Sequence, residues 1–103
     1  MKTLTFVTGL TLALASAGAW AGVEDAMTKA GCMACHAKDK KMIGPAFKEI
    51  AAKYKGQDVV ATLMQKVRTG GKGNFGPIPM APNPPDKIND ADLKAAVELI
   101  LKS

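Results

Sequence analysis

The chain has 103 residues, of which 48% are hydrophobic and 22% charged, and its formal net charge is +5. This length allows one domain at most, and so small a domain has difficulty burying enough apolar surface to fold securely. The basic excess is modest, and the aromatic residues, 5% of the chain, are not interleaved with the lysines as nucleic-acid binding requires. Composition therefore argues against several domains and against a nucleic-acid partner.

The first 21 residues have the features of a secretory signal peptide. Lys2 gives a positive start, the run from Leu4 to Ala17 is apolar or small, and Ala19-Trp20-Ala21 fits the small-x-small cleavage rule. A membrane anchor is the alternative, but the apolar run is shorter than the roughly 20 residues of a spanning helix. We expect cleavage after Ala21, export to the periplasm, and no membrane insertion of the mature domain, residues 22–103.

A first helix is predicted from Val23 to Ala30, with Gly31 at its end, and Cys32-Met33-Ala34-Cys35-His36 follows at once. C-x-x-C-H is the attachment signature of c-type haem. Two thiols three positions apart can add to the two vinyl groups of one porphyrin, and the adjacent imidazole then faces the iron. Two close cysteines in an exported chain otherwise suggest a disulfide, but His36 beside them favours haem. The haem would supply the core that the short chain lacks.

Three further helices are predicted after a loop that begins at Ala37 and is broken by Gly44-Pro45. Apolar residues recur at helical spacing from Phe47 to Tyr54, with a stop near Gly56, and again from Val60 to Val67. The second of these helices is expected to open at Asp58 and to close at Gly70 and Gly71.

The last helix has the clearest signals. Asn89 is its expected N-cap, Asp92 stands at the capping-box position, and Ile88 and Leu93 form a hydrophobic staple. No strand pattern occurs in the sequence. The predicted fold is therefore all-α, with about four short helices around one haem.

His36 would fill one axial position of the haem iron, and whether a side chain fills the second position decides the function. The mature region has no other histidine for that second position. Met80 is the expected ligand, since it stands in Gly76-Pro77-Ile78-Pro79-Met80-Ala81-Pro82, inside a loop from Gly70 to Asp86 that holds five prolines and four glycines. Such a long loop in a small domain is usually functional. The other methionines of the mature region are expected to be core filler, or to lie too close to the attachment motif: Met27, Met33, Met42 and Met64.

These motifs together resemble the small bacterial class I cytochromes c of the c-551 type. The resemblance covers nearly all of the mature region and includes Cys32 to His36, Gly44-Pro45-Ala46, Ala51-Ala52-Lys53-Tyr54, and Gly76 to Met80 followed by Pro82 and Asn83. It implies the class I cytochrome c fold and a soluble periplasmic one-electron carrier. Such a protein is not an enzyme, and we expect it to be a monomer.

The resemblance also implies roles for single residues. The carbonyl of Pro45 would accept a hydrogen bond from Nδ1 of His36, and Asn83 would hydrogen-bond near the sulfur of Met80. Two positions depart from the family pattern: Phe75 replaces a tryptophan that meets a haem propionate, and Lys66, with Arg68 nearby, replaces an arginine that approaches the propionates.

The expected partners are acidic-surfaced redox proteins. By resemblance, the donor is a membrane quinol-oxidising complex and the acceptor a terminal reductase, an oxidase or a photosynthetic reaction centre. A basic surround could steer such partners: Lys29, Lys38, Lys40, Lys41, Lys48, Lys66, Arg68 and Lys72.

Two alternatives stay open at this point. The first is a catalytic or sensing haem protein whose sixth iron position is free. The second is zinc or thiol chemistry without haem, although zinc normally needs a second ligand pair and a thioredoxin-like site needs a βαβ context.

Overall fold

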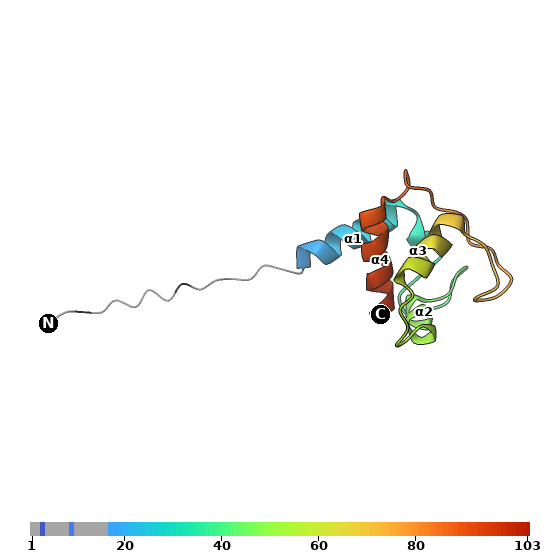
Figure 1. Cartoon of the computed structure of the whole chain (residues 1–103), viewed down its shortest axis with the longest axis horizontal. Helices are drawn as coiled ribbons and strands as arrows, with labels where there is room; N and C mark the ends of the chain where they lie inside the picture. Colours follow the sequence, from blue (N-terminus) through green and yellow to red (C-terminus); the bar gives the residue numbers. More distant parts are fainter. Residues whose placement is uncertain (1–2, 4–8, 10–16) are drawn as a thin grey trace.

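A computed structural model describes residues 3, 9 and 17–103 (Figure 1). It contains four α-helices and one short 3-10 helix: α1 (Ala17–Lys29), η1 (Cys32–Ala34), α2 (Phe47–Lys53), α3 (Val60–Thr69) and α4 (Asp90–Leu101). In the described part of the chain, β-pairing is limited to a single isolated bridge between Gly71 and Met80. The all-α prediction is therefore confirmed.

The C-terminal helix α4 is the centre of the fold, because α1, α2 and α3 all pack against it (Figure 1). Its buried residues Leu93, Ala96 and Val97 form the middle of the core. Met27 of α1 and Phe47 of α2 join them, and both are at least nine-tenths buried. Contact with three helices requires a broad apolar face, and the apolar residues of α4 from Leu93 to Leu101 provide one.

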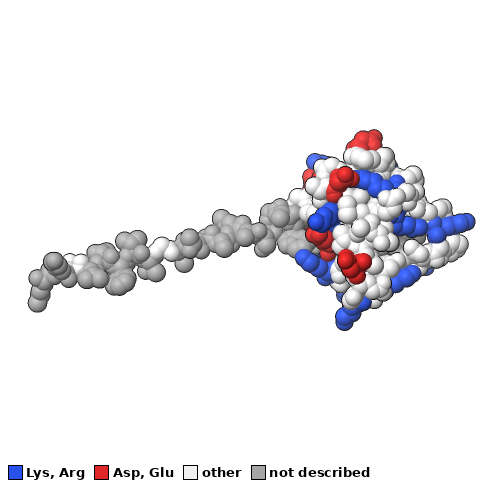
Figure 2. Space-filling model, in the orientation of Figure 1, with Lys and Arg blue, Asp and Glu red and all other residues white. Residues whose placement is uncertain are grey.

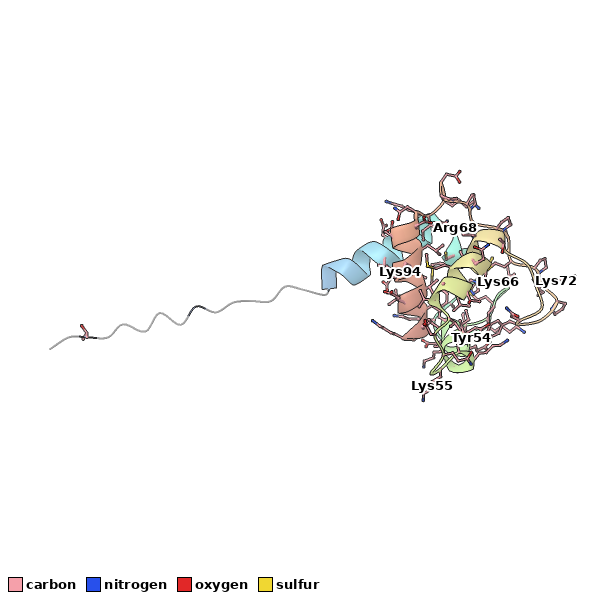
Figure 3. The ribbon with its side chains drawn as sticks, in the orientation of Figure 1. Tyr54, Lys55, Lys66, Arg68, Lys72 and Lys94 are labelled. Atoms are coloured by element: carbon pink, nitrogen blue, oxygen red, sulfur yellow. The ribbon has the colours of Figure 1, made fainter. Side chains whose placement is uncertain are left out.

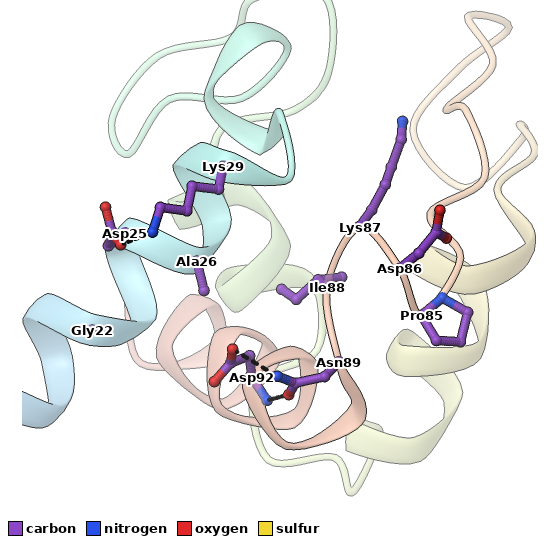
Figure 4. A pocket seen from close by; sticks show the side chains of 10 residues that line it. All are labelled: Gly22, Asp25, Ala26, Lys29, Pro85, Asp86, Lys87, Ile88, Asn89 and Asp92. Atoms are coloured by element: carbon purple, nitrogen blue, oxygen red, sulfur yellow. Dashed lines mark hydrogen bonds and ion pairs between the residues drawn. The ribbon is translucent and has the colours of Figure 1, made fainter.

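The predicted N-cap of α4 is present, with an asparagine and an aspartate in the places of the usual capping-box residues. Asn89 Oδ1 accepts a hydrogen bond from the backbone N–H of Asp92 at 2.8 Å, and Asn89 Nδ2 donates to the Asp92 carboxylate at 3.1 Å. This reciprocal pair lines a polar pocket of about 300 Å³ between α1 and α4 (Figure 4). Ile88, the residue before the cap, is buried in the core beside Leu93 as expected of a staple.

Two helix starts differ from the prediction. α1 begins at Ala17 instead of Val23, which is consistent with the high helix propensity of the alanines in Ala-Gly-Ala-Trp-Ala-Gly. α3 is capped by Val59, without a side-chain hydrogen bond, so Asp58 was the wrong opening residue and lies one position too early. The other bounds agree with the prediction to within a few residues.

The predicted signal peptide, residues 1–21, lies largely outside the described residues. α1 runs through the expected cleavage position after Ala21. None of the helices in the part of the chain that the structure describes is long and apolar enough to cross a membrane.

Candidate haem-binding site

The two cysteines and His36 lie on one tight turn directly after α1. Gly31, with φ 88°, ends the helix, and η1 follows. The carbonyl of Cys32 accepts hydrogen bonds from the backbone N–H groups of Cys35 and His36, at 3.2 and 3.0 Å. This turn brings both thiols and the imidazole to the wall of one cavity. The predicted grouping of the three side chains is thus present.

The environment of Cys32 does not favour thiol chemistry. Burial raises the pKa of the Cys32 thiol, and the nearby Cys35 acts in the same direction. Reactive C-x-x-C sites depend on a lowered thiol pKa. Metal binding also lacks support, since no group of three or more His, Cys, Asp or Glu among the described residues is placed to hold a metal ion.

His36 is held from three sides and is only 9% exposed. Its Nδ1 lies 2.7 Å from the carbonyl oxygen of Pro45. A carbonyl can only accept, so Nδ1 carries the hydrogen and Nε2 is left as a free donor atom for iron. The ring of Phe47 stacks on the imidazole with 5.4 Å between centroids. The contact that the resemblance implied for Pro45 is therefore present in the structure.

Gly44 is close to His36 in a way that only glycine permits. A Cβ built on Gly44 would lie 2.6 Å from Cε1 and 2.9 Å from Nδ1 of the imidazole. The backbone N–H of Gly44 also donates to the Cys35 carbonyl at 2.8 Å, which ties this loop to the attachment turn. The sequence showed Gly44 only as a chain breaker before Pro45, so this role was missed.

The cavity in front of His36 has a volume of about 360 Å³ and a mainly apolar wall. Every α-helix contributes residues to its wall. The loop before α2 and the loop after α3 contribute as well. Its apolar lining includes Met27, Ile50, Leu63, Val67, Leu93 and Val97. Two cysteines and an imidazole with a free Nε2 at the wall of an apolar cavity are the donor set and surroundings that a covalently bound haem requires. The residues present therefore fit this group.

Met80 lies in the same cavity, on a loop that is fastened to the end of α3. Gly71 N donates to the Met80 carbonyl at 3.0 Å, and Met80 N donates to the Gly71 carbonyl at 2.8 Å. Gly70 precedes this bridge with φ 68°, and a Cβ there would overlap the Met80 carbonyl and lie 2.9 Å from Pro82 N. A side chain at residue 70 would thus push the Met80 segment away from α3.

The other candidate methionines are placed as expected. Met33 and Met42 are each 41% exposed and do not line the cavity. Met64 packs against the core from α3, also outside the cavity wall. Met27 does line the cavity, but it is 2% exposed and belongs to the central core cluster. Met80 is the cavity methionine carried by a loop rather than by a core-packed helix.

Asn83 is buried next to the Met80 loop. Its Nδ2 donates to the carbonyls of Ala81 at 3.1 Å and of Val67 at 3.3 Å, and its backbone N–H donates to Val67 at 3.0 Å. Both side-chain donor bonds therefore end on backbone carbonyls. The hydrogen bond near the Met80 sulfur stays a prediction, whereas a role of Asn83 in fastening the loop to α3 is present here.

The rim of the cavity is basic and partly apolar. Lys41, Lys66 and Lys72 line it, and none of them has an ion-pair partner among the described residues. Figure 3 shows Lys66 on α3 and Lys72 on the loop that follows it. Arg68, in contrast, is not part of the cavity wall and binds the segment before α4. Of the two basic residues considered for the propionates, Lys66 is the one at the cavity.

Phe75 lies on the same rim and is held by α2. Lys53 Nζ lies 4.4 Å from the centroid of the Phe75 ring and donates to the Asn74 carbonyl at 2.5 Å. Tyr54 meets the Phe75 ring edge-on at 6.4 Å. The phenylalanine thus keeps an aromatic contact with the loop, although it lacks the N–H of tryptophan. Sequence periodicity did not reveal this Lys53 contact.

Comparisons with known proteins agree with this site. The model of the Cytochrome c family matches residues 23–103. Cytochrome c2 of Rubrivivax gelatinosus is 52% identical over 77 residues, which cover 74% of this chain and 91% of the relative. Cytochrome c-551 of Azotobacter vinelandii is 47% identical over 79 residues, which cover 76% of this chain and 93% of the relative. The crystal structure of wild-type Nitrosomonas europaea cytochrome c552 superimposes with a TM-score of 0.69 at 42% identity, covering 77% of this chain and 96% of that one.

The fold and the site define a haem protein built from four α-helices, and the chain belongs to the cytochrome c family. Within that family it is a small class I cytochrome c with one haem, similar to the c-551, c-552 and c2 proteins. It carries one covalently attached haem c, and Cys32 and Cys35 stand in the C-x-x-C-H position for it. Its membership of this family identifies the chain as an electron carrier.

Proposed function

We propose that the chain is a periplasmic one-electron carrier in which His36 and Met80 are the two axial ligands of the haem iron. The observation that carries this proposal is that Cys32, Cys35, His36 and Met80 all line the same apolar cavity. Haem c supplies an iron that cycles between the ferric and ferrous states. The chain has no substrate chemistry of its own, since both axial positions belong to protein side chains.

Each proposed ligand is held by the backbone rather than by the iron alone. Pro45 and Gly44 orient the imidazole, and the bridge to Gly71 fixes the Met80 segment. With both side chains held in this way, little rearrangement of the chain would accompany the gain or loss of one electron by a bound haem. A thioether opposite an imidazole also raises the reduction potential.

The basic rim supports docking of acidic redox proteins. Lys41, Lys66 and Lys72 surround the cavity without neutralising partners, whereas Lys29, Lys38, Lys48 and Arg68 are paired with carboxylates. Only part of the predicted basic surround is therefore free to steer a partner. The proposed donor is a membrane quinol-oxidising complex, and the proposed acceptor is a terminal reductase, an oxidase or a photosynthetic reaction centre.

The proposed export is tested on the mature protein. A mass equal to residues 22–103 plus one haem would support cleavage after Ala21 and attachment to the two cysteines. A mass that retains the leader, or that lacks the haem, would contradict the respective part of the proposal.

The proposed ligand is tested by spectroscopy on the ferric holoprotein and on Met80→Ala. We expect the near-infrared sulfur-to-iron charge-transfer band in the native protein and its complete loss in Met80→Ala. In its ferrous form the variant should also bind carbon monoxide rapidly, and its reduction potential should be lower than that of the native protein. Met33→Ala, which alters an exposed methionine outside the cavity, is the control and should keep the band. Rapid carbon monoxide binding to the native ferrous protein would support the alternative with an open iron position.

A further inference from the structure

Arg68 has an unusual environment for a basic residue of this protein. Its side chain is 16% exposed, although it lies on the short helix α3 of a domain with many exposed lysines. Figure 3 shows it at the end of α3 nearest the chain that leads into α4. It does not line the haem cavity, so the proposed electron transfer makes no direct use of it.

The guanidinium makes three hydrogen bonds to one short segment. Nη1 donates to the carbonyls of Asn83 at 3.0 Å and Ile88 at 2.7 Å, and Nη2 donates to Asp90 Oδ1 at 2.6 Å. The planar fork of arginine can reach several acceptors at once, which the single ammonium of lysine does less well. Residues 83–90 are thereby clamped to α3.

The Asn83 end of this clamp is directly connected to the Met80 loop. Asn83 N and Nδ2 donate to the Val67 carbonyl, and Nδ2 also donates to the Ala81 carbonyl, one residue after Met80. Met80 itself is bridged to Gly71 on its other side. The loop therefore has two attachments to the end of α3, one through Gly71 and one through Asn83, and Arg68 closes the second.

We infer that Arg68 is a positioning residue for the proposed axial ligand Met80. It acts at a distance, by fixing the carbonyl of Asn83 and hence the end of the loop that carries the thioether. This inference rests on the proposed ligation by Met80. Asp90, whose side chain is 84% exposed, contributes less to this positioning, and the two part-buried hydrogen bonds to the carbonyls contribute more.

The test compares three variants of the ferric holoprotein in a urea titration. Two signals are followed: the near-infrared sulfur-to-iron band, and the far-ultraviolet circular dichroism of the helices. In Arg68→Met, we expect the band to disappear at a clearly lower urea concentration than the helical signal. In Asp90→Asn, which keeps both carbonyl bonds, the two midpoints should stay as close together as in the native protein. Lys94→Met is the matched control, since it removes an exposed cation from α4.

Amide hydrogen exchange gives a second readout. The N–H groups of Met80 and Asn83, which donate to Gly71 and Val67, should exchange about tenfold faster in Arg68→Met, relative to amides in the middle of α4. If Arg68→Met yields no holoprotein, Arg68→Lys is measured in the same way and should show the same effect to a smaller degree.

Two results would overturn the inference. One is a parallel shift of both urea midpoints in Arg68→Met with uniform exchange changes, which would mean a general structural role. The other is no change in either readout. Failure of the proposed ligation is seen separately, because the band would then be absent from the native protein or would persist in Met80→Ala, whatever Arg68 does.

Discussion

The imidazole of His36 has little freedom in this structure. One nitrogen is bound to the Pro45 carbonyl, the ring stacks on Phe47, and the backbone of Gly44 fills the remaining contact. The hydrogen bond determines the tautomer, and the two packing contacts determine the orientation of the ring. Each of these contacts comes from the eleven residues that follow the attachment turn, residues 37–47.

Gly44→Ala tests this arrangement at the scale of one methyl group. The new Cβ would lie 2.6 Å from Cε1 of His36, so the imidazole or the loop must move. We expect the holoprotein to lose about 1–3 kcal/mol of unfolding free energy and its haem spectrum to change. Gly22→Ala is the control, because nothing lies within 4 Å of a Cβ there. An unchanged spectrum and urea midpoint in Gly44→Ala would contradict the proposed constraint on His36.

At the scale of elements, the periodic stripes located α2, α3 and α4 to within a few residues. The errors are at helix starts, where periodicity gives little information. α1 extends over an alanine-rich stretch that has no stripe, and α3 begins without the side-chain cap that Asp58 suggested. Helix starts depend on local backbone bonds, which several neighbouring residues can satisfy equally well.

The N-terminal cap of α4 can be tested directly. Asn89→Ala removes the acceptor for the Asp92 N–H, and with it the bond to the Asp92 carboxylate. We expect a loss of about 1 kcal/mol in unfolding free energy, measured by urea denaturation of the holoprotein. Asn74→Ala is the control, since that exposed side chain makes no hydrogen bond within the described residues. Equal stability of the two variants would show that the cap is not needed.

Charge is distributed unevenly over the whole molecule. Residues 37–72 hold nine of the basic residues and three acidic ones, whereas the two ends of the mature chain hold six acidic and four basic ones. On the face shown in Figure 2, acidic side chains gather over the α1 and α4 side. Lys66 and Lys72 lie on the other side, at the rim of the cavity (Figure 3). The cavity therefore has basic residues in its lining, away from this acidic group.

This asymmetry predicts how the protein reacts with small charged oxidants. Oxidation of the ferrous protein by an anionic complex such as hexacyanoferrate should slow as ionic strength rises, because salt screens the attraction. At low salt, Lys72→Glu should slow this reaction by about twofold to fivefold, as expected for reversing one nearby charge in water. Lys94→Glu makes the same change in net charge away from the cavity and should have a smaller effect. Equal effects would mean that net charge alone matters.

The sequence by itself determined the all-α class, the attachment of haem at Cys32 and Cys35 as an expectation, and the choice of His36 and Met80 as candidate ligands. These conclusions depend on local patterns: a pentapeptide with a specific chemistry, helical periodicity, and a methionine among prolines. Local patterns need no knowledge of which distant segments meet.

Apart from Pro45, which the family resemblance indicated, the residues that hold the candidate ligands in place were decided by the tertiary structure. The close approach of Gly44 to His36, the bridge from Gly71 to Met80 and the clamp of Arg68 on Asn83 all join residues that lie between 8 and 15 positions apart. The tertiary structure also showed that Arg68 faces the segment before α4, whereas Lys66 faces the cavity. Lys66 and Arg68 are two positions apart on α3, so their side chains do not share a face of the helix. The spacing alone does not tell which of them faces the cavity. The packing of α3 against α4 decides it.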